Sequence, residues 1–235
     1  MAFNRAAQRE NNSVAARLVR KALQKGFTRA YKTIEVNPRK FYSQLGKSHH
    51  LAVSSSQSMF AVPLPVIDKL ADEIIRSDMK KAAAEGAGFG MGGIITLLPD
   101  LSVLAAITVR SIQKLSLVYG FEFVTDEEVS EFWVAAATAA GIDISKDILE
   151  KQVVKRFVPR VIERIAARAS AEVVEKWMAR LVPMVSSVIG GGMNYYFVRA
   201  WGNRAKAHFR ERHLLVRSQP GSHQTPEAGI QSLPR

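Results

Sequence analysis

The sequence predicts an all-α fold, a helical bundle with no significant sheet. Apolar residues recur every three or four positions along most of the chain, and no strand-like alternation follows Ile144. Two glycine-rich apolar segments stand out, EGAGFGMGGIITLLPDLSVLAAITV at 85–109 and VPMVSSVIGGGMNYYFV at 182–198. Because small residues let helices approach closely, we expect these segments to form two hairpins that pack together at the core. The predicted contact residues are Gly86, Gly88, Gly90, Gly93, Gly190, Gly191 and Gly192.

Composition and charge limit the kinds of partner. The 235 residues are ample for a buried core, and the absence of cysteine excludes disulfides, thiolate zinc sites and a cysteine nucleophile. The net charge is +12, and residues 1–50 hold eleven Lys or Arg against only Glu10 and Glu35. This excess favours an anionic partner, either a lipid surface or, less strongly, a nucleic acid. No apolar signal-peptide core begins the chain, so we expect it in the cytoplasm, at the inner face of the membrane.

The first predicted helix runs from Val14 to Ile34, after a frayed segment at 1–13. Its apolar positions recur at helical spacing from Val14 through Leu18 and Phe27, and its other face is basic. Two interpretations are open: the helix binds an anionic membrane surface, or it packs its apolar face on the domain. The residues predicted to bind an anionic surface are Arg17, Lys21, Lys25, Arg29 and Lys32, with Arg204 and Arg210 from a basic helix predicted at Tyr195–Leu215.

The middle of the chain contains a predicted linker, a predicted helix and the long apolar run 86–109. Residues 35–65 indicate a linker or irregular cover, and Val66–Ala84 a helix. The apolar run 86–109 is long enough to cross a membrane, but Pro99 breaks a helix and Asp100 is costly at a bilayer centre. We therefore expect two half-length helices that meet at Pro99-Asp100, either as a buried core pair or as a shallow membrane hairpin, in preference to a simple transmembrane helix.

Residues typical of helix starts and helix ends predict the bounds of the remaining helices. Asp100 is expected to cap a helix at Leu101–Tyr119, with Gly120 as its left-handed stop. Thr125-Asp-Glu-Glu128 is a capping box that opens a helix at Asp126–Ala140, which ends at Gly141. Pro159 is expected to separate helices at Ser145–Phe157 and Arg160–Met178. The predicted organisation is a basic helix and linker at 1–48, a helical domain at 49–216 and a disordered tail at 217–235.

Motifs for catalysis or cofactor binding are weak. Gly88, Gly90 and Gly93 match G-x-G-x-x-G, but a helical pattern precedes them and no acid follows at the required distance. The S-x-x-K pairs Ser77–Lys80 and Ser111–Lys114 lack the companion motifs of serine-lysine enzymes. His208, Glu211 and His213 do not share one helix face. We therefore expect no cofactor and no metal.

Polar residues within apolar runs are the remaining candidates. They are Glu85, Asp100, Arg110 and Asn194, and a buried charge must be paired. Either the two acids cap helices while the arginine reaches the surface, or all four form a polar cluster at the core. In the second case Glu85 and Asp100 are weak candidates for a catalytic carboxylate pair.

The segment AAAEGAGFGMGGIITLLPDLSVLAAITVRSIQKLSLVYGFE resembles the core of the EcsC protein family. VPMVSSVIGGGMNYYFVRAWGNRAKAHFRERH is similar to the C-terminal block of that family, with Asn194, Ala205 and Phe209 at its matching positions. The resemblance covers roughly residues 66–215. The family takes its name from a bacterial protein encoded beside an ABC transporter linked to secretion. The resemblance implies a helical, membrane-associated accessory protein and supplies no catalytic residues.

Three functional hypotheses follow. The leading one is a non-enzymatic accessory protein, peripheral on an anionic membrane, that supports a transporter or an envelope process. The second is a small hydrolase with an interior carboxylate site at Glu85 and Asp100. The third is non-specific nucleic-acid binding through the basic ends.

Overall fold

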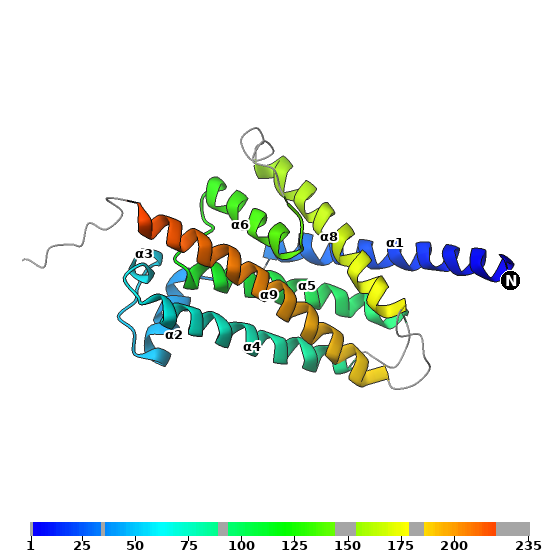
Figure 1. Cartoon of the computed structure of the whole chain (residues 1–235), viewed down its shortest axis with the longest axis horizontal. Helices are drawn as coiled ribbons and strands as arrows, with labels where there is room; N and C mark the ends of the chain where they lie inside the picture. The colour runs from blue at the N-terminus through cyan, green and yellow to red at the C-terminus, as the bar shows by residue number, and fades with distance from the viewer. Residues whose placement is uncertain (1, 34–35, 89–93, 144–153, 179–185, 220–235) are drawn as a thin grey trace, which may run out of the picture.

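A computed structural model describes residues 2–33, 36–88, 94–143, 154–178 and 186–219 (Figure 1). Every regular element in these ranges is a helix, which confirms the all-α prediction. The helices are α1 (Ala2–Thr33), α2 (Pro38–His49), α3 (Ser56–Met59), α4 (Leu64–Gly88), α5 (Ile94–Val118), α6 (Asp126–Ala139), α8 (Val154–Met178) and α9 (Ser186–Ser218).

The long helices α1, α4 and α5 run close to the long axis of the molecule, and α9 crosses over α5 and α4 (Figure 1). Helix α5 lies at the centre, in contact with α1, α4, α6 and α9. The most extensive helix pairing among the described residues is that of α4 with α9, and α1 packs on α5 and α8. One continuous core results, to which α1 contributes Val19, Leu23, Phe27 and Ala30. The first helix therefore packs its apolar face on the domain.

Helix α5 explains the long apolar run. Within the described residues, Leu101–Val118 is long and apolar enough to cross a membrane by composition, and 67% of it is buried inside the bundle. That burial is what the central helix of a bundle requires. The prediction of two half-helices meeting at Pro99-Asp100 was wrong, because α5 is continuous from Ile94 through both residues. Asp100 therefore does not begin a helix.

Three of the predicted helix-end signals were correct: the capping box of α6 and the glycines Gly120 and Gly141. Thr125 Oγ1 accepts from Glu128 N, and the Glu128 carboxylate accepts from Thr125 N, which completes the capping box of α6. Gly120 and Gly141 have φ of 86° and 74°, and both follow helix ends, as predicted. These positive φ values favour glycine because a Cβ would crowd the following carbonyl.

Three other boundaries differ from the predictions. Helix α1 begins at Ala2, so residues 2–13 are helical. Residues 35–65 contain α2 and α3: Asn37 caps α2 with Pro38 in its first turn, and Ser55 caps α3 through a capping box. Helix α8 continues through Pro159. A proline in a helix interior costs roughly 3 kcal/mol, and the flanking Phe157, Val158, Val161 and Ile162, all at most 3% exposed, supply burial that offsets it.

The glycine-rich hairpins are not shown. Gly86 and Gly88 lie in the last turns of α4, and Gly190, Gly191 and Gly192 lie inside α9. Gly90 and Gly93 lie outside the described residues. A Cβ built on Gly192 meets no described atom within 4 Å beyond its own helix, so this glycine makes no close contact with the described residues.

Close helix contacts occur instead at two isolated glycines. A Cβ on Gly26 of α1 would lie 2.8 Å from Ser102 Cα of α5, and one on Gly202 of α9 would lie 3.0 Å from Ile75 Cγ1 of α4. These glycines therefore set how closely α1 approaches α5 and how closely α9 approaches α4.

Candidate functional site

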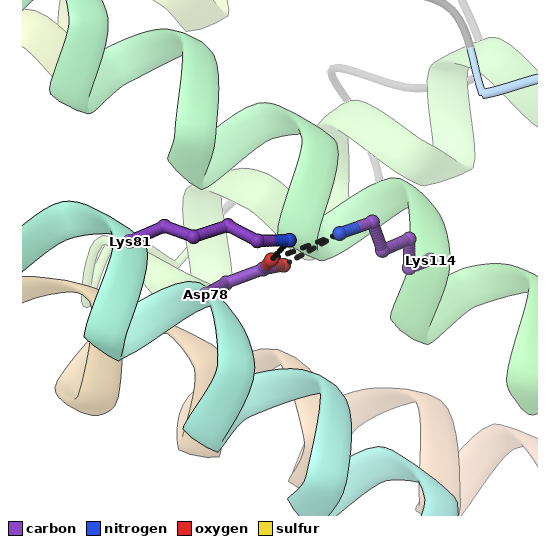
Figure 2. Close-up of polar contacts among 3 residues, drawn as sticks. All are labelled: Asp78, Lys81 and Lys114. Carbon is purple, nitrogen blue, oxygen red and sulfur yellow. Dashed lines mark hydrogen bonds and ion pairs between the residues drawn. The ribbon is translucent and has the colours of Figure 1, made fainter.

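A buried ion pair links α4 to α5 (Figure 2). Asp78 is 2% exposed, and its two carboxylate oxygens accept from Lys114 Nζ at 2.9 and 3.0 Å. Lys81 donates to the same carboxylate at 3.3 Å and has 61% of its side chain exposed. Figure 2 shows the two lysines reaching Asp78 from opposite sides.

The position of Asp78 follows from helical spacing. Ala71, Ile75, Asp78 and Ala82 recur at intervals of four, three and four, and all are buried, so the aspartate lies on the inner face of α4. A carboxylate there must be paired, because an unpaired buried charge costs several kcal/mol. Burial lowers the pKa of Lys114, while the neighbouring Asp78 carboxylate raises it, and the net direction is down. The pair therefore joins two helices through charges that are only partly solvated.

A second polar network, near the N-terminal end of α4, joins α4 to α9 and to Tyr119, which follows α5. Asp68 accepts from Tyr119 Oη at 2.6 Å and from Arg210 Nε at 3.0 Å. One turn along, Lys206 donates to Asp72 at 2.6 Å. Burial alone would raise the pKa of Asp68, but the hydrogen bonds from Tyr119 and Arg210 and the nearby cations hold it below its usual value. Burial, aided by the hydrogen bond to Asp68, raises the pKa of Tyr119.

His213 extends this network into the core. Its Nδ1 lies 2.8 Å from the Tyr119 carbonyl oxygen, and its ring stacks on Phe60 with 4.7 Å between the centroids. The residue is fully buried. His208, five residues earlier on α9, has a pKa lowered by burial and by the charge of Arg212. Within the described part of the chain, no group of three or more His, Asp or Glu is arranged to hold a metal ion.

The predicted polar cluster is not assembled as expected. Glu85 and Arg110 are exposed, on α4 and α5, whereas Asn194 is 1% exposed on α9. The side chain of Asp100 lies outside the described residues. An interior carboxylate pair of Glu85 and Asp100 therefore lacks its first member.

The predicted basic residues divide into two groups. Arg204 and Arg210 are engaged inside the fold: Arg204 Nε donates to the Ala139 carbonyl oxygen at the end of α6, and Arg210 pairs with Asp68. The α1 residues are exposed instead, and Arg20 pairs with Glu163 of α8. The predicted α1 residues in this exposed set are Arg17, Lys21, Lys25, Arg29 and Lys32.

The outer stripe of α1 consists of Val14, Leu18, Lys21, Lys25, Arg29 and Lys32. These positions follow one another at intervals of four, three, four, four and three, so they fall within about 80° of the helix circumference. All six are exposed, with Val14 at 41% and Leu18 at 39%. The four cations have no ion-pair partner among the described residues. The sequence prediction placed Val14 and Leu18 on the same apolar face as Phe27, but they lie outside the buried face, which consists of Val19, Leu23, Phe27 and Ala30.

These features define a helical-bundle protein with a buried ion pair between α4 and α5 and a mixed basic and aliphatic stripe on its first helix. The profile of the EcsC protein family matches residues 2–214. The chain belongs to the EcsC protein family, which confirms the resemblance and extends it to include α1.

Two relatives come from Bacillus subtilis (strain 168). The chain is 29% identical to Protein EcsC over 159 residues, which cover 66% of this chain and 66% of that protein. It is 28% identical to Uncharacterized protein YdbA over 68 residues, which cover 29% of this chain and 25% of that protein. No solved structure is significantly similar to the chain.

Proposed function

We propose that this EcsC-family protein is a non-enzymatic accessory protein that binds an anionic membrane surface through the outer stripe of α1. The observation that carries the proposal is the composition of that stripe, in which four cations with no ion-pair partner among the described residues share one narrow face with two exposed aliphatic side chains. Cations near an anionic bilayer contribute about 1 kcal/mol each. Four of them give about 4 kcal/mol, which supports reversible, peripheral binding.

The aliphatic residues favour lipid over nucleic acid. Val14 and Leu18 lie on the same stripe as the cations, at its N-terminal end. A phosphate backbone offers them no apolar surface, whereas the boundary between headgroups and acyl chains does. The stripe therefore matches the mixed character of a bilayer interface.

Peripheral binding also agrees with the packing of α1 and α5. The inward face of α1 buries Leu23 and Phe27 at 0% and 1% exposure, so the helix is anchored while its outer stripe faces outward. Helix α5, the apolar candidate span, is mostly enclosed by its neighbours. Binding through α1 requires neither helix to leave the bundle.

The accessory role, beside a membrane transporter or an envelope process at the inner face of the cytoplasmic membrane, is the part of the proposal that comes from family resemblance. The hydrolase alternative is weakened because Glu85 is exposed. Nucleic-acid binding is retained as an outcome of the test below.

Vesicle flotation with a charge-reversed stripe tests the proposal. The protein is expected to float with phosphatidylglycerol vesicles and to remain in solution with phosphatidylcholine vesicles. Lys21→Glu with Lys25→Glu removes two favourable cations, about 2 kcal/mol at least, so binding should weaken about thirtyfold or more. Lys69→Glu with Arg76→Glu is the matched control, because both residues are exposed on α4 and the net charge changes equally.

Equal recovery in solution with both kinds of vesicle would overturn the proposal. So would an equal loss of binding in the stripe variant and in the α4 control. Binding to duplex DNA with no binding to anionic vesicles would refute the membrane proposal and support nucleic-acid binding by the stripe.

A further inference from the structure

A cavity of about 250 Å³ lies where the C-terminal end of α1 meets α5 and α6. Val109 and Gln113 of α5 contribute to its lining, as do Val129, Phe132 and Trp133 of α6. Phe123, which precedes α6, and the last turn of α1 complete it. The cavity is thus built by three helices of the core, outside the polar networks described above.

Aromatic rings in mutual contact form much of the lining. Tyr31 meets Trp133 edge to face with 5.6 Å between the centroids, and Phe132 meets Trp133 in the same way at 5.6 Å. Phe123 lies 5.7 Å from Phe132. Because each ring is held by the next, the wall is fixed before any ligand arrives, which lowers the entropic cost of binding.

About half of the exposed lining surface is polar, and Lys32, Thr33 and Gln113 are among the residues that line it. Gln113 Oε1 accepts from Val36 N, which fixes this amide in the wall. Thr33 Oγ1 donates to the Arg29 carbonyl oxygen. Lys32 is the one charged residue of the described lining, and it also belongs to the outer stripe of α1. The described lining therefore combines an aromatic and aliphatic part with a polar part of similar area, in which Lys32 is the one cation.

We propose that this cavity binds a single-chain anionic amphiphile, with the acyl chain against the aromatic wall and the carboxylate or phosphate at Lys32. A cavity of roughly 150 Å³ holds benzene, with six carbon atoms, so about 250 Å³ holds about ten non-hydrogen atoms. Octanoate, with eight carbons and two oxygens, has this size. The cavity assignment stands on its own lining, and only the idea that a membrane lipid supplies the chain rests on the proposed function.

Titration calorimetry with sodium octanoate, below its micellar concentration, tests the assignment on the full chain. Octanoate should bind, and octylammonium, which places a cation beside Lys32, should bind at least tenfold more weakly. Val129→Phe adds a ring to the lining and should weaken octanoate binding at least tenfold, with the fold checked by circular dichroism. Lys32→Ala should weaken octanoate binding about tenfold. Lys25→Ala, a stripe residue outside the lining, is the matched control and should not change it.

The assignment is overturned if the wild-type protein does not bind octanoate, if octylammonium binds equally well, or if Lys32→Ala and Lys25→Ala have equal effects. If Val129→Phe does not fold, Lys32→Glu replaces it, because that change is confined to an exposed side chain. A parallel arm with phosphatidylglycerol vesicles separates the two proposals. Octanoate binding without vesicle binding would refute the proposed membrane function and support the cavity, with a free fatty acid as its ligand. Vesicle binding without octanoate binding would support the proposed membrane function and refute the cavity assignment.

Discussion

The buried pair of Asp78 and Lys114 makes a quantitative prediction about two lysines that contact the same carboxylate. Lys114 donates to both oxygens of Asp78 at 2.9 and 3.0 Å, and 19% of its side chain is exposed. Lys81 donates at 3.3 Å with 61% of its side chain exposed. Lys114→Met and Lys81→Met therefore remove the same chemical group from two different environments.

The magnitudes follow from what each variant leaves behind. Lys114→Met leaves a carboxylate that is 2% exposed with only the outer lysine beside it, and removing one partner of a buried pair costs roughly 3–5 kcal/mol. We expect about 3 kcal/mol, because Lys81 retains part of the compensation. Lys81→Met should cost at most ~1 kcal/mol, the usual value for an exposed pair. For a chain of this size, ~1 kcal/mol shifts Tm by about 2–4 °C, so the expected losses are about 6–12 °C and at most about 4 °C.

The assay is thermal and urea unfolding followed by circular dichroism, with Asp78→Leu and the double variant Asp78→Leu, Lys114→Met completing a cycle. Replacing a buried pair by apolar residues is often close to neutral, so the double variant should lie within about 1 kcal/mol of the wild type. Equal losses from the two lysine variants, or additive losses in the double variant, would refute the assignment of Lys114 as the principal partner of Asp78.

Three further predictions concern the helix contacts and the second network. Gly26→Ala would normally raise the free energy of unfolding by ~1 kcal/mol, because alanine favours a helix. Here the added Cβ would lie 2.8 Å from Ser102 Cα, so urea unfolding should show a net loss of about 1–3 kcal/mol. A gain in stability would contradict the close contact of α1 with α5. Tyr119→Phe removes the hydrogen bond to Asp68 and should lower the free energy of unfolding by about 1–2 kcal/mol, whereas Tyr196→Phe, at an exposed tyrosine of α9, should change it little. The lowered pKa of Asp68 means that its stabilising contribution is present above its unfolded value near 3.8 and is lost as the pH falls through the folded value. Asp68→Asn should therefore flatten the decline of Tm below about pH 4, and an unchanged slope would count against the network.

The helix ends that were predicted correctly are determined by one residue or by a few neighbouring residues. Thr125 and Glu128 form a capping box from four consecutive residues, and Gly120 and Gly141 stop helices because of their own backbone conformation. The ends of α2 and α3 carried similar signals, Asn37-Pro38 and Ser55, which the linker interpretation of residues 35–65 overlooked. Pro159 failed as a boundary because its cost is local, whereas the burial of Phe157 and Val161 that offsets it is tertiary.

The buried pair shows a similar division between local and tertiary information. The spacing of Ala71, Ile75, Asp78 and Ala82 would have placed the aspartate on the inner face of its helix. Its partner Lys114 lies 36 residues away, and no local pattern identifies which cation meets that carboxylate. The motif Ser111–Lys114 had drawn attention to the correct lysine for a different reason.

On helix α1, the spacing of apolar residues alone predicted one face where the structure has two separate stripes. Val14 and Leu18 continue at helical spacing into Lys21 and Lys25, while Val19 starts a separate series through Leu23, Phe27 and Ala30. Only the second series is buried, because Gly26 lies on that side and lets α1 approach Ser102 of α5. The same glycine that weakens the isolated helix therefore fixes its orientation, and the orientation decides which residues face outward. The outer stripe, and the membrane function we propose for it, depend on a close packing contact made on the opposite side of the helix.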